Sequence, residues 1–364
     1  MEKTIKEGEI TIIIDNGVFY NPDAEINRDL SVAALSAWIK REKPEKIKIL
    51  DAFSGTGITG MRYAKECNNN IFVVLNDRCP KAARNIQENV QRNGLKNCEV
   101  SNNDCIQIMA KDHFTIIDID PFGTPAPFLD AAVRSVWWKG LLMVTATDTA
   151  ALNGSSPSAG LRKYGIFSGR TDFYIEFGLR ALTTAIMLSC GRNGKAFFPL
   201  FCLAQKHYYR VIGRLSFRDK DITRMMDEIK MSSYCQKCGN RVIGIENACE
   251  CGGRFSNYGP LFIGKIYDKE YCIDMMKYIA CKPVTPKGIK ELELLNKYIE
   301  EPEIDTPFYF DVHRLARLHH KNIKKMGDII SALKAAGFSA GYSAFCPTGI
   351  KTDAPLKEVV SNLD

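Results

Sequence analysis

Residues 116–125 read IIDIDPFGTP, in which a β-branched apolar run ends in acids and then meets Pro-Phe-Gly. Such a run is typical of the carboxyl end of a buried parallel strand, where open α/β sheets bind their ligands. The Asp120 carboxylate and the Pro121 carbonyl are two fixed acceptors for an exocyclic amine, and Phe122 can stack on a flipped-out base. We therefore predict methyl transfer to a base amine, with Asp120 accepting the proton and Asp118 as a strand-end or supporting acid. The non-functional alternative is an Asp-Pro turn with a core phenylalanine.

A glycine-rich turn follows the first predicted strand, in the segment DAFSGTGITG at 51–60. Gly55 and Gly57 begin a G-x-G-x-x-G pattern, and Asp77 closes the next strand 20 residues after Gly57. This pattern binds dinucleotides, with the acid on the ribose hydroxyls, but S-adenosylmethionine sites use the same turn and acid. Asp51 lies four residues before Gly55, where an acid can meet the amino acid moiety of S-adenosylmethionine and where NAD sites normally have an apolar residue. The turn favours S-adenosylmethionine, and an NAD-binding oxidoreductase is the alternative from another class.

A third acid follows the next predicted strand, in the segment SNNDC at 101–105. Asp104 is placed to accept a hydrogen bond from the adenine amino group, and Cys105 beside it belongs to the same predicted cofactor site. The alternative for Asp104 is a loop acid or a helix cap.

Four cysteines lie close together at 235–251, as a C-x2-C pair and a C-x-C pair. They are Cys235, Cys238, Cys249 and Cys251. Four thiolates fill the tetrahedral shell of zinc and leave no open position, so the spacing predicts a structural zinc site. A redox pair or free thiols are the alternative.

Strand-like and helix-like segments alternate over residues 46–146. Buried strands are predicted at 46–50, 71–76, 98–101, 114–119 and 140–146, with helices at 58–66, 80–93 and 126–137. This alternation predicts a parallel, doubly wound α/β sheet. The Gly/Ser-rich stretch at 147–172 is long for a loop without structure, so we expect it to be functional.

Two basic segments are candidates for contact with an anionic partner. At 206–218 a period of two predicts a half-buried strand with a cationic outer face, either a solvated edge strand or a phosphate-contacting surface; this face holds Lys206, Tyr208, Arg210, Arg214 and Arg218. Near the C-terminus one amphipathic helix carries a basic face, either solvated or facing RNA, formed by Arg314, Arg317, Lys321, Lys324 and Lys325.

The composition is that of a globular protein with a sizeable core, with 45% hydrophobic and 25% charged residues in a chain of 364. The net charge of +7 hints at an anionic partner. The apolar stretch at 177–190 contains Arg180 and is too short to span a bilayer. Because the charged N-terminus lacks the apolar core of a signal peptide, we expect a cytoplasmic protein with no membrane partner.

Several longer motifs carry a resemblance to a known family. They are DIDPFGTPAPFLDAA (118–132), VFYNP (18–22), NRDLSV (27–32), VTATD (144–148), LRKYG (161–165) and CPTGIKTDAP (346–355). Together they resemble the archaeal and eukaryotic tRNA (guanine-26-N2) dimethyltransferases over nearly the whole chain. The resemblance implies a Rossmann-like class I methyltransferase that transfers two methyl groups from S-adenosylmethionine to one tRNA guanine. An amino-methyltransferase acting on another RNA guanine or on adenine remains the alternative within the class.

The resemblance also implies roles for individual residues. Cofactor binding would fall to Arg28, Arg62, Asp77 and Asp104. Phe19 and Phe122 would hold the guanine between them, and Asp120 would be the base. We expect residues 1–268 to form the methyltransferase domain, with a zinc-binding insertion at 232–257, and residues 269–364 to form a smaller α+β domain that docks tRNA. The oligomeric state stays open, with a monomer as the default.

Overall fold

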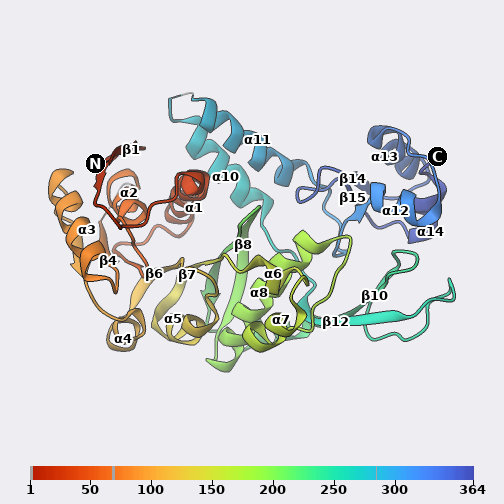
Figure 1. The fold of residues 1–364 in the computed structure, drawn as a ribbon, viewed down its shortest axis with the longest axis horizontal. Helices are drawn as coiled ribbons and strands as arrows, with labels where there is room; N and C mark the ends of the chain where they lie inside the picture. Colours follow the sequence, from red (N-terminus) through yellow and green to blue (C-terminus); the bar gives the residue numbers. More distant parts are fainter. Residues whose placement is uncertain (1–2, 68–69, 284) are drawn as a thin grey trace.

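The computed structural model describes residues 3–67, 70–283 and 285–364, and its largest element is a seven-stranded sheet (Figure 1). The strand order is β5-β4-β3-β6-β7-β9-β8, and only β9 runs antiparallel to its neighbours. The strands are β3 (Ile47–Asp51), β4 (Ile71–Asn76), β5 (Cys98–Ser101), β6 (Phe114–Ile119), β7 (Val136–Ala146), β8 (Ala196–Gln205) and β9 (Tyr208–Ser216). The predicted parallel α/β sheet is therefore confirmed, although β7 begins at Val136 rather than at 140.

Helices cover both faces of this sheet, as parallel strands with apolar side chains on both faces require. On one face α1 (Glu25–Glu42) packs against α2 (Ile58–Glu66) and α10 (Lys269–Ala280), near α3 (Pro80–Arg92). On the other face α5 (Leu129–Ser135) packs against α4 (Cys105–Lys111) and α8 (Tyr174–Arg192). The helix predicted at 126–137 is shorter, because a 3-10 turn occupies Ala126–Phe128 and β7 starts directly after Ser135.

The strand predicted at 206–218 differs most from its expected environment. It was expected to be half-buried with a cationic outer face, but β9 lies between β7 and β8 and is covered on both sides. Arg210 is only 2% exposed, and Arg214 lies over the Phe198 ring. The predicted cationic outer face is therefore wrong. Arg210, which was counted as part of that face, is buried and pairs with a carboxylate inside the protein.

The stretch at 147–172 is also more ordered than an open loop. It contains α6 (Thr149–Leu152) and α7 (Pro157–Tyr164), which pack against each other and against α8.

A hairpin of β1 (Lys3–Glu7) and β2 (Ile10–Ile14) precedes the sheet and is held by Asn89 of α3 and by Asn93, which caps the C-terminal end of α3. Asn89 accepts a hydrogen bond from the Ile13 N–H at 2.9 Å and donates to the Ile13 carbonyl at 3.0 Å. Asn93 makes the same pair of bonds with Thr11, at 3.0 and 2.8 Å. The polar face of α3 thus serves as a partner for the backbone of β2, which leads into the loop that carries Phe19.

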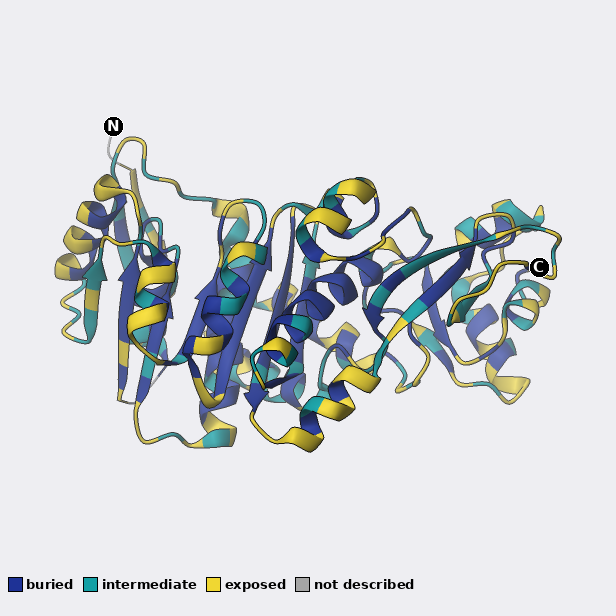
Figure 2. Ribbon diagram, turned by 90° about the horizontal axis from the view of Figure 1, so that it is seen from below, coloured by how far each residue is buried: buried dark blue, intermediate teal, exposed yellow. Residues whose placement is uncertain are grey.

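A second small sheet extends away from the first and reaches the C-terminal part of the chain (Figure 2). Its strands are β10 (Ile229–Cys235), β11 (Arg241–Ile243) and β12 (Phe255–Phe262). We call residues 235–251 at its far end the cysteine knuckle. Across the described ranges, no helix is both long and apolar enough to cross a bilayer.

The C-terminal elements form a smaller α+β unit, as predicted. A sheet of β13 (Phe310–Asp311), β15 (Gly349–Thr352) and β14 (Ala340–Tyr342) packs with α12 (Val312–His319), α13 (Met326–Ala335) and α14 (Leu356–Ser361). The single basic amphipathic helix predicted there is wrong, because the chain turns at His320 with a φ of 52° and separates α12 from α13. Lys321 and Lys324 contact the last residue of the chain, Asp364, instead of continuing a basic face.

The hydrophobic cores change later in the chain than residue 268. Buried residues of α10 and α11 (Pro286–Glu300), such as Tyr271 and Leu295, belong to the core around the large sheet. A separate core begins at Phe310. The boundary at 268 stays a prediction of the sequence, while packing divides the chain near residue 309.

Glu176 of α8 joins the two cores. Its carboxylate accepts hydrogen bonds from Arg180, from the backbone N–H groups of Phe308 and Tyr309, and from Lys351 of β15. Burial alone would raise its pKa, but the Lys351 and Arg180 charges outweigh burial and lower the pKa to about 2. A buried carboxylate with two cations and two N–H donors is stable only when all of them stay in place.

We expect Glu176→Gln to lower the free energy of unfolding at pH 7 by about 3 kcal/mol, because it leaves two buried cations without a counter-charge. Since the folded-state pKa of Glu176 is depressed to about 2, its stabilisation is complete above the unfolded pKa of about 4.3 and is lost as pH falls through the folded value. Urea unfolding should therefore show a smaller difference at pH 3.5 than at pH 7. Glu303→Gln, at an exposed ion pair with Lys265, is the control and should change little. A difference independent of pH would contradict this account.

Candidate active site

Three carboxyl groups lie at the carboxyl ends of β3 and β6. Asp51 ends β3 and pairs in register with Asp118 of β6, and Asp120 follows two residues later. The sequence placed these acids at one sheet edge, and the structure brings them together there.

Arg210 of β9 neutralises the central acid of this group. It reaches past β7 and donates two hydrogen bonds to the Asp118 carboxylate, at 3.0 and 2.9 Å, and one to Thr145 Oγ1 at 2.7 Å. The Tyr63 hydroxyl donates a further bond to Asp118 at 2.7 Å. Three donors of the protein therefore occupy Asp118, which fits the supporting role predicted for it. Sequence reasoning missed the role of Arg210; the one hint was an arginine within the otherwise apolar run YYRVIG.

Asp120 is the acid of this group that is open to solvent. Loss of solvation by the surrounding protein raises its pKa to about 6, against the opposing effect of Arg210 and with an added contribution from Asp118. Contact of the exposed side chain with water limits this rise. Asp120 can thus hold or release a proton near neutral pH, as a general base requires.

The Tyr208 hydroxyl is a second polar group near Asp120, whereas the sequence placed Tyr208 only on the predicted cationic face of its strand. It is buried without a hydrogen-bond partner among the described residues, and its pKa is raised by burial and further by the charge of Asp120.

Asp51 is buried and accepts a hydrogen bond from the Gly60 N–H at 3.1 Å. Burial and the neighbouring Asp118 charge raise the pKa of Asp51 to about 8. Within the described ranges Asp51 has no ion-pair partner. A cationic group of a ligand would therefore stabilise its ionised form.

The glycine turn between β3 and α2 has the backbone that its sequence requires. Gly55 and Gly57 have φ values of +55° and +79°, where a side chain would add strain. The Gly55 N–H donates to the Asp77 carboxylate at 3.0 Å. Each Asp77 oxygen keeps a lone pair for a further donor, and the binding of a ribose by this turn and acid stays a prediction.

Asp104 is the N-cap of α4 and accepts from the Ile106 N–H at 2.8 Å. The helix cap given above as the alternative for Asp104 is therefore present, and the second carboxylate oxygen of Asp104 is left for a ligand. Cys105 is the first residue of α4, and burial raises the pKa of its thiol to about 11, so it is not an ionised thiol at neutral pH.

The two arginines expected to bind cofactor lie in a buried ion-pair group around Glu7 of β1. Arg28 donates two bonds to Glu7, at 2.7 and 2.6 Å, and one to the Asn21 carbonyl. Arg62 binds Glu66 and lies 2.6 Å from Asp29. To reach a cofactor, Arg62 would have to break one of these ion pairs. Arg28 lies near enough to Asp120 for its positive charge to lower the pKa of that carboxyl.

Phe19 and Phe122 face each other across the site from different segments. Their ring centroids are 4.4 Å apart at an interplanar angle of 82°, and the side chains are 54% and 73% exposed. The two predicted partners are thus together, but in edge-to-face contact that leaves no room for a base. They must separate before a base can enter.

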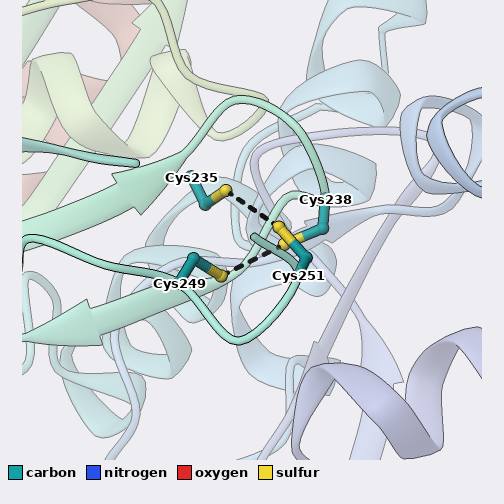
Figure 3. Close-up of side chains that lie close together, drawn as sticks. All are labelled: Cys235, Cys238, Cys249 and Cys251. Carbon is teal, nitrogen blue, oxygen red and sulfur yellow. Dashed lines mark hydrogen bonds between the residues drawn. The ribbon is translucent and has the colours of Figure 1, made fainter. Parts of the chain in front are cut away.

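The cysteine knuckle brings all four thiols into one cluster (Figure 3). The Sγ atoms lie within 4.8 Å of one another, and the Cys235–Cys251 and Cys238–Cys249 pairs are each 3.6 Å apart. Four thiolates bound tetrahedrally at about 2.3 Å have nearly this spacing, so the residues fit a structural zinc. His319 of α12 contacts the Cys238 carbonyl at 2.8 Å, so the knuckle also packs on the C-terminal unit.

The strand order, the glycine turn and the acids after β3, β4 and β6 define a Rossmann-like, S-adenosylmethionine-dependent methyltransferase with a cysteine insertion. The family model for N2,N2-dimethylguanosine tRNA methyltransferase matches residues 1–364. The chain belongs to this family, which confirms the resemblance inferred from the motifs and leaves the NAD alternative without support.

Individual relatives agree over nearly their full length. The tRNA (guanine(26)-N(2))-dimethyltransferase of Methanosarcina acetivorans is 35% identical over 358 residues, covering 94% of this chain and 90% of its own. That of Archaeoglobus fulgidus is 36% identical over 364 residues, covering 99% and 98%. The structure of Trm1 from Pyrococcus horikoshii with S-adenosyl-L-methionine superposes with a TM-score of 0.89 at 30% identity, covering both chains completely.

We expect the purified protein to contain one zinc ion per chain, measured by elemental analysis, and Cys238→Ser to lose the metal and lower the melting temperature. Binding of S-adenosylmethionine by the folded protein should be unchanged, because the knuckle is remote from the glycine turn in the sequence and belongs to another sheet. Cys281→Ser, at an exposed cysteine outside the cluster, is the control. A Cys238→Ser protein with full zinc content and unchanged melting temperature would contradict the site.

Proposed function

We propose that this protein transfers two methyl groups from S-adenosylmethionine to the N2 amine of guanine 26 in tRNA. The observation that carries the proposal is the Asp120-Pro121-Phe122 segment, which follows β6 beside the glycine turn in a chain of this family. The names of the full-length relatives supply the tRNA and the position of the guanine.

The cofactor would lie along the carboxyl ends of β3, β4 and β5. S-adenosylmethionine supplies an electrophilic methyl group when bound. Asp77 would accept from the ribose hydroxyls, and Asp104 from the adenine amine. The buried Asp51 carboxyl, which lacks a cation in the described structure, would meet the ammonium of the amino acid moiety. Arg28 would face the carboxylate of that moiety.

The guanine would enter between Phe19 and Phe122 after the two rings part. Both rings are exposed and belong to segments outside the strands, so this movement does not disturb the core. Stacking between two aromatic rings would offset the cost of removing the base from its helix. It would also fix the plane of the base relative to Asp120.

Asp120 would then accept the proton that N2 loses in each transfer. The amine lone pair of guanine is delocalised into the ring, so N2 becomes a good nucleophile only when hydrogen-bond acceptors draw its N–H groups out of conjugation. The Asp120 carboxylate and the Pro121 carbonyl are two such acceptors. After the first transfer one N–H remains, and Asp120, which is open to solvent, would release its proton to water before the same carboxylate serves the second transfer.

The tRNA would dock on the C-terminal unit and the cysteine knuckle. The exposed Arg317 of α12 and Lys325 before α13 would meet the RNA backbone. The cytoplasm is the compartment we propose, because all 13 cysteines are free in the structure, as expected under reducing conditions.

Incubation of unmodified tRNA with the protein and labelled S-adenosylmethionine should yield labelled N2,N2-dimethylguanosine, detected by mass spectrometry of the nucleosides. A tRNA with adenosine at position 26 is the matched control and should stay unlabelled. Methyladenosine as the product, or labelling of the control tRNA to the same extent, would overturn the proposal.

We expect Asp120→Asn to lower the methylation rate by about 10²- to 10⁴-fold, as for loss of a general base, while calorimetry shows an unchanged affinity for S-adenosylmethionine. Because the pKa of Asp120 is raised to about 6, the wild-type rate should rise with pH through that value and level off above it. The residual rate of the variant should lack this dependence. Equal loss of rate and cofactor affinity would show that Asp120 is not the base.

A further inference from the structure

The segments 144–148 and 161–165 contact the turn that carries Phe122. The Gly123 N–H donates to Thr147 Oγ1 at 2.7 Å, and the Thr147 N–H donates to the Gly123 carbonyl at 2.9 Å. Gly123 has a φ of +84°, which lets the chain reverse there. Both polar groups of its backbone are thus bound to the residue just after β7.

A chain of side-chain hydrogen bonds continues from this turn into α7. Thr124 donates to the Tyr164 hydroxyl at 2.9 Å, and Tyr164 donates to Asp148 at 2.5 Å. Lys163 also donates to Asp148, at 2.8 Å. These hydrogen bonds run in one direction, from Thr124 through Tyr164 to Asp148, because a carboxylate accepts hydrogen bonds and does not donate them. We call Thr124, Tyr164, Asp148 and Lys163 the clasp.

Tyr164, the central residue of the clasp, is buried, which indicates a fixed arrangement there. Tyr164 is only 4% exposed, and burial together with the Asp148 carboxylate holds its pKa above the usual range, so the hydroxyl keeps the proton it donates. A buried hydroxyl that both accepts and donates in one chain tolerates little displacement.

The clasp holds a residue that has little other support. Phe122 is 73% exposed and contacts Phe19, which is itself 54% exposed, so its position depends on the backbone of its turn. One end of that turn is Asp120, at the end of β6, and the other is Gly123. Catalytic groups must be held close to their productive geometry, and a misplacement of about 1 Å can cost on the order of 10²-fold in rate.

We propose that Tyr164 and Asp148 are positioning residues for methyl transfer: through Thr124 they hold the turn 121–124, and thereby Phe122, in place for the guanine. This inference rests on the proposed function. It gives a role to the VTATD and LRKYG segments, which contain no group that reaches the methyl donor or the base directly in the proposed mechanism.

The test uses Tyr164→Phe, which keeps the ring and its packing and removes only the hydroxyl, and Asp148→Asn, which keeps the shape and removes the charge. Ser158→Ala, at an exposed position of the same helix, is the control. Measured for each are the melting temperature, the affinity for S-adenosylmethionine by calorimetry, and kcat and KM for tRNA methylation. We expect kcat to fall by about 10-fold in both clasp variants, with KM, cofactor affinity and melting temperature close to wild type.

A double-mutant cycle then shows whether the clasp acts through Phe122. If it does, Tyr164→Phe will lower kcat far less in a Phe122→Ala background than in the wild type. Equal effects in both backgrounds, an unchanged kcat, or a loss confined to melting temperature or KM would each overturn the positioning role. A wild-type protein that forms no dimethylguanosine would instead overturn the proposed function itself, and this inference with it.

Discussion

The active edge of the sheet depends on one buried ion pair. Asp51, Asp118 and Asp120 lie at neighbouring strand ends, and three carboxyl groups in one low-dielectric region repel one another strongly when all are ionised. Arg210 relieves this repulsion with two hydrogen bonds to Asp118. Breaking a buried pair of this kind leaves an uncompensated charge, which is costly. The pair also spans β7, because Arg210 belongs to β9 and Asp118 to β6.

With Asp118 occupied, the two remaining acids are left with different properties. Asp51 is buried beside the glycine turn and has no ion-pair partner in the part of the chain that the structure describes, while Asp120 faces solvent. Chemically similar side chains thus acquire separate roles through their surroundings, as in other enzymes whose acids and bases are both carboxyl groups. Polar residues of α7 and the end of β7 then hold the turn after Asp120 from the opposite side. In the proposed mechanism, the reacting region is therefore held by groups that need not touch either substrate.

Local patterns of the sequence were sufficient to predict the strands that end at the active edge of the sheet. They were insufficient to predict contacts between side chains from distant segments. The strands β4, β5 and β6 have the predicted limits, because apolar runs followed by acids are a local property of the chain. Arg210 was placed on a solvent-facing strand because a period of two does not reveal which strand lies beside β7. The sequence likewise did not reveal the ion pairs of Arg62, because one of its three carboxylate neighbours, Glu7, comes from a distant segment. The break at His320 was missed because the apolar residues on its two sides have a spacing that fits one helix as well as two.

The asparagines of α3 carry a consequence for how this enzyme can vary. Four helical residues rise by about 6 Å, and two strand residues by about 6.6 Å, so Asn89 and Asn93 match Ile13 and Thr11 without adjustment. Their amides bind peptide groups only, so they are indifferent to which side chains β2 carries. They do, however, require a fixed number of residues between the two peptide groups that they bind in β2. Substitutions at Thr11 and Ile13 of β2 should be tolerated during divergence, because these residues are only partly buried, unlike Ile10 and Ile12 of the core. An inserted or deleted residue would shift Phe19 relative to the glycine turn, so lineages should preserve the spacing between these segments more strictly than the composition at those two positions.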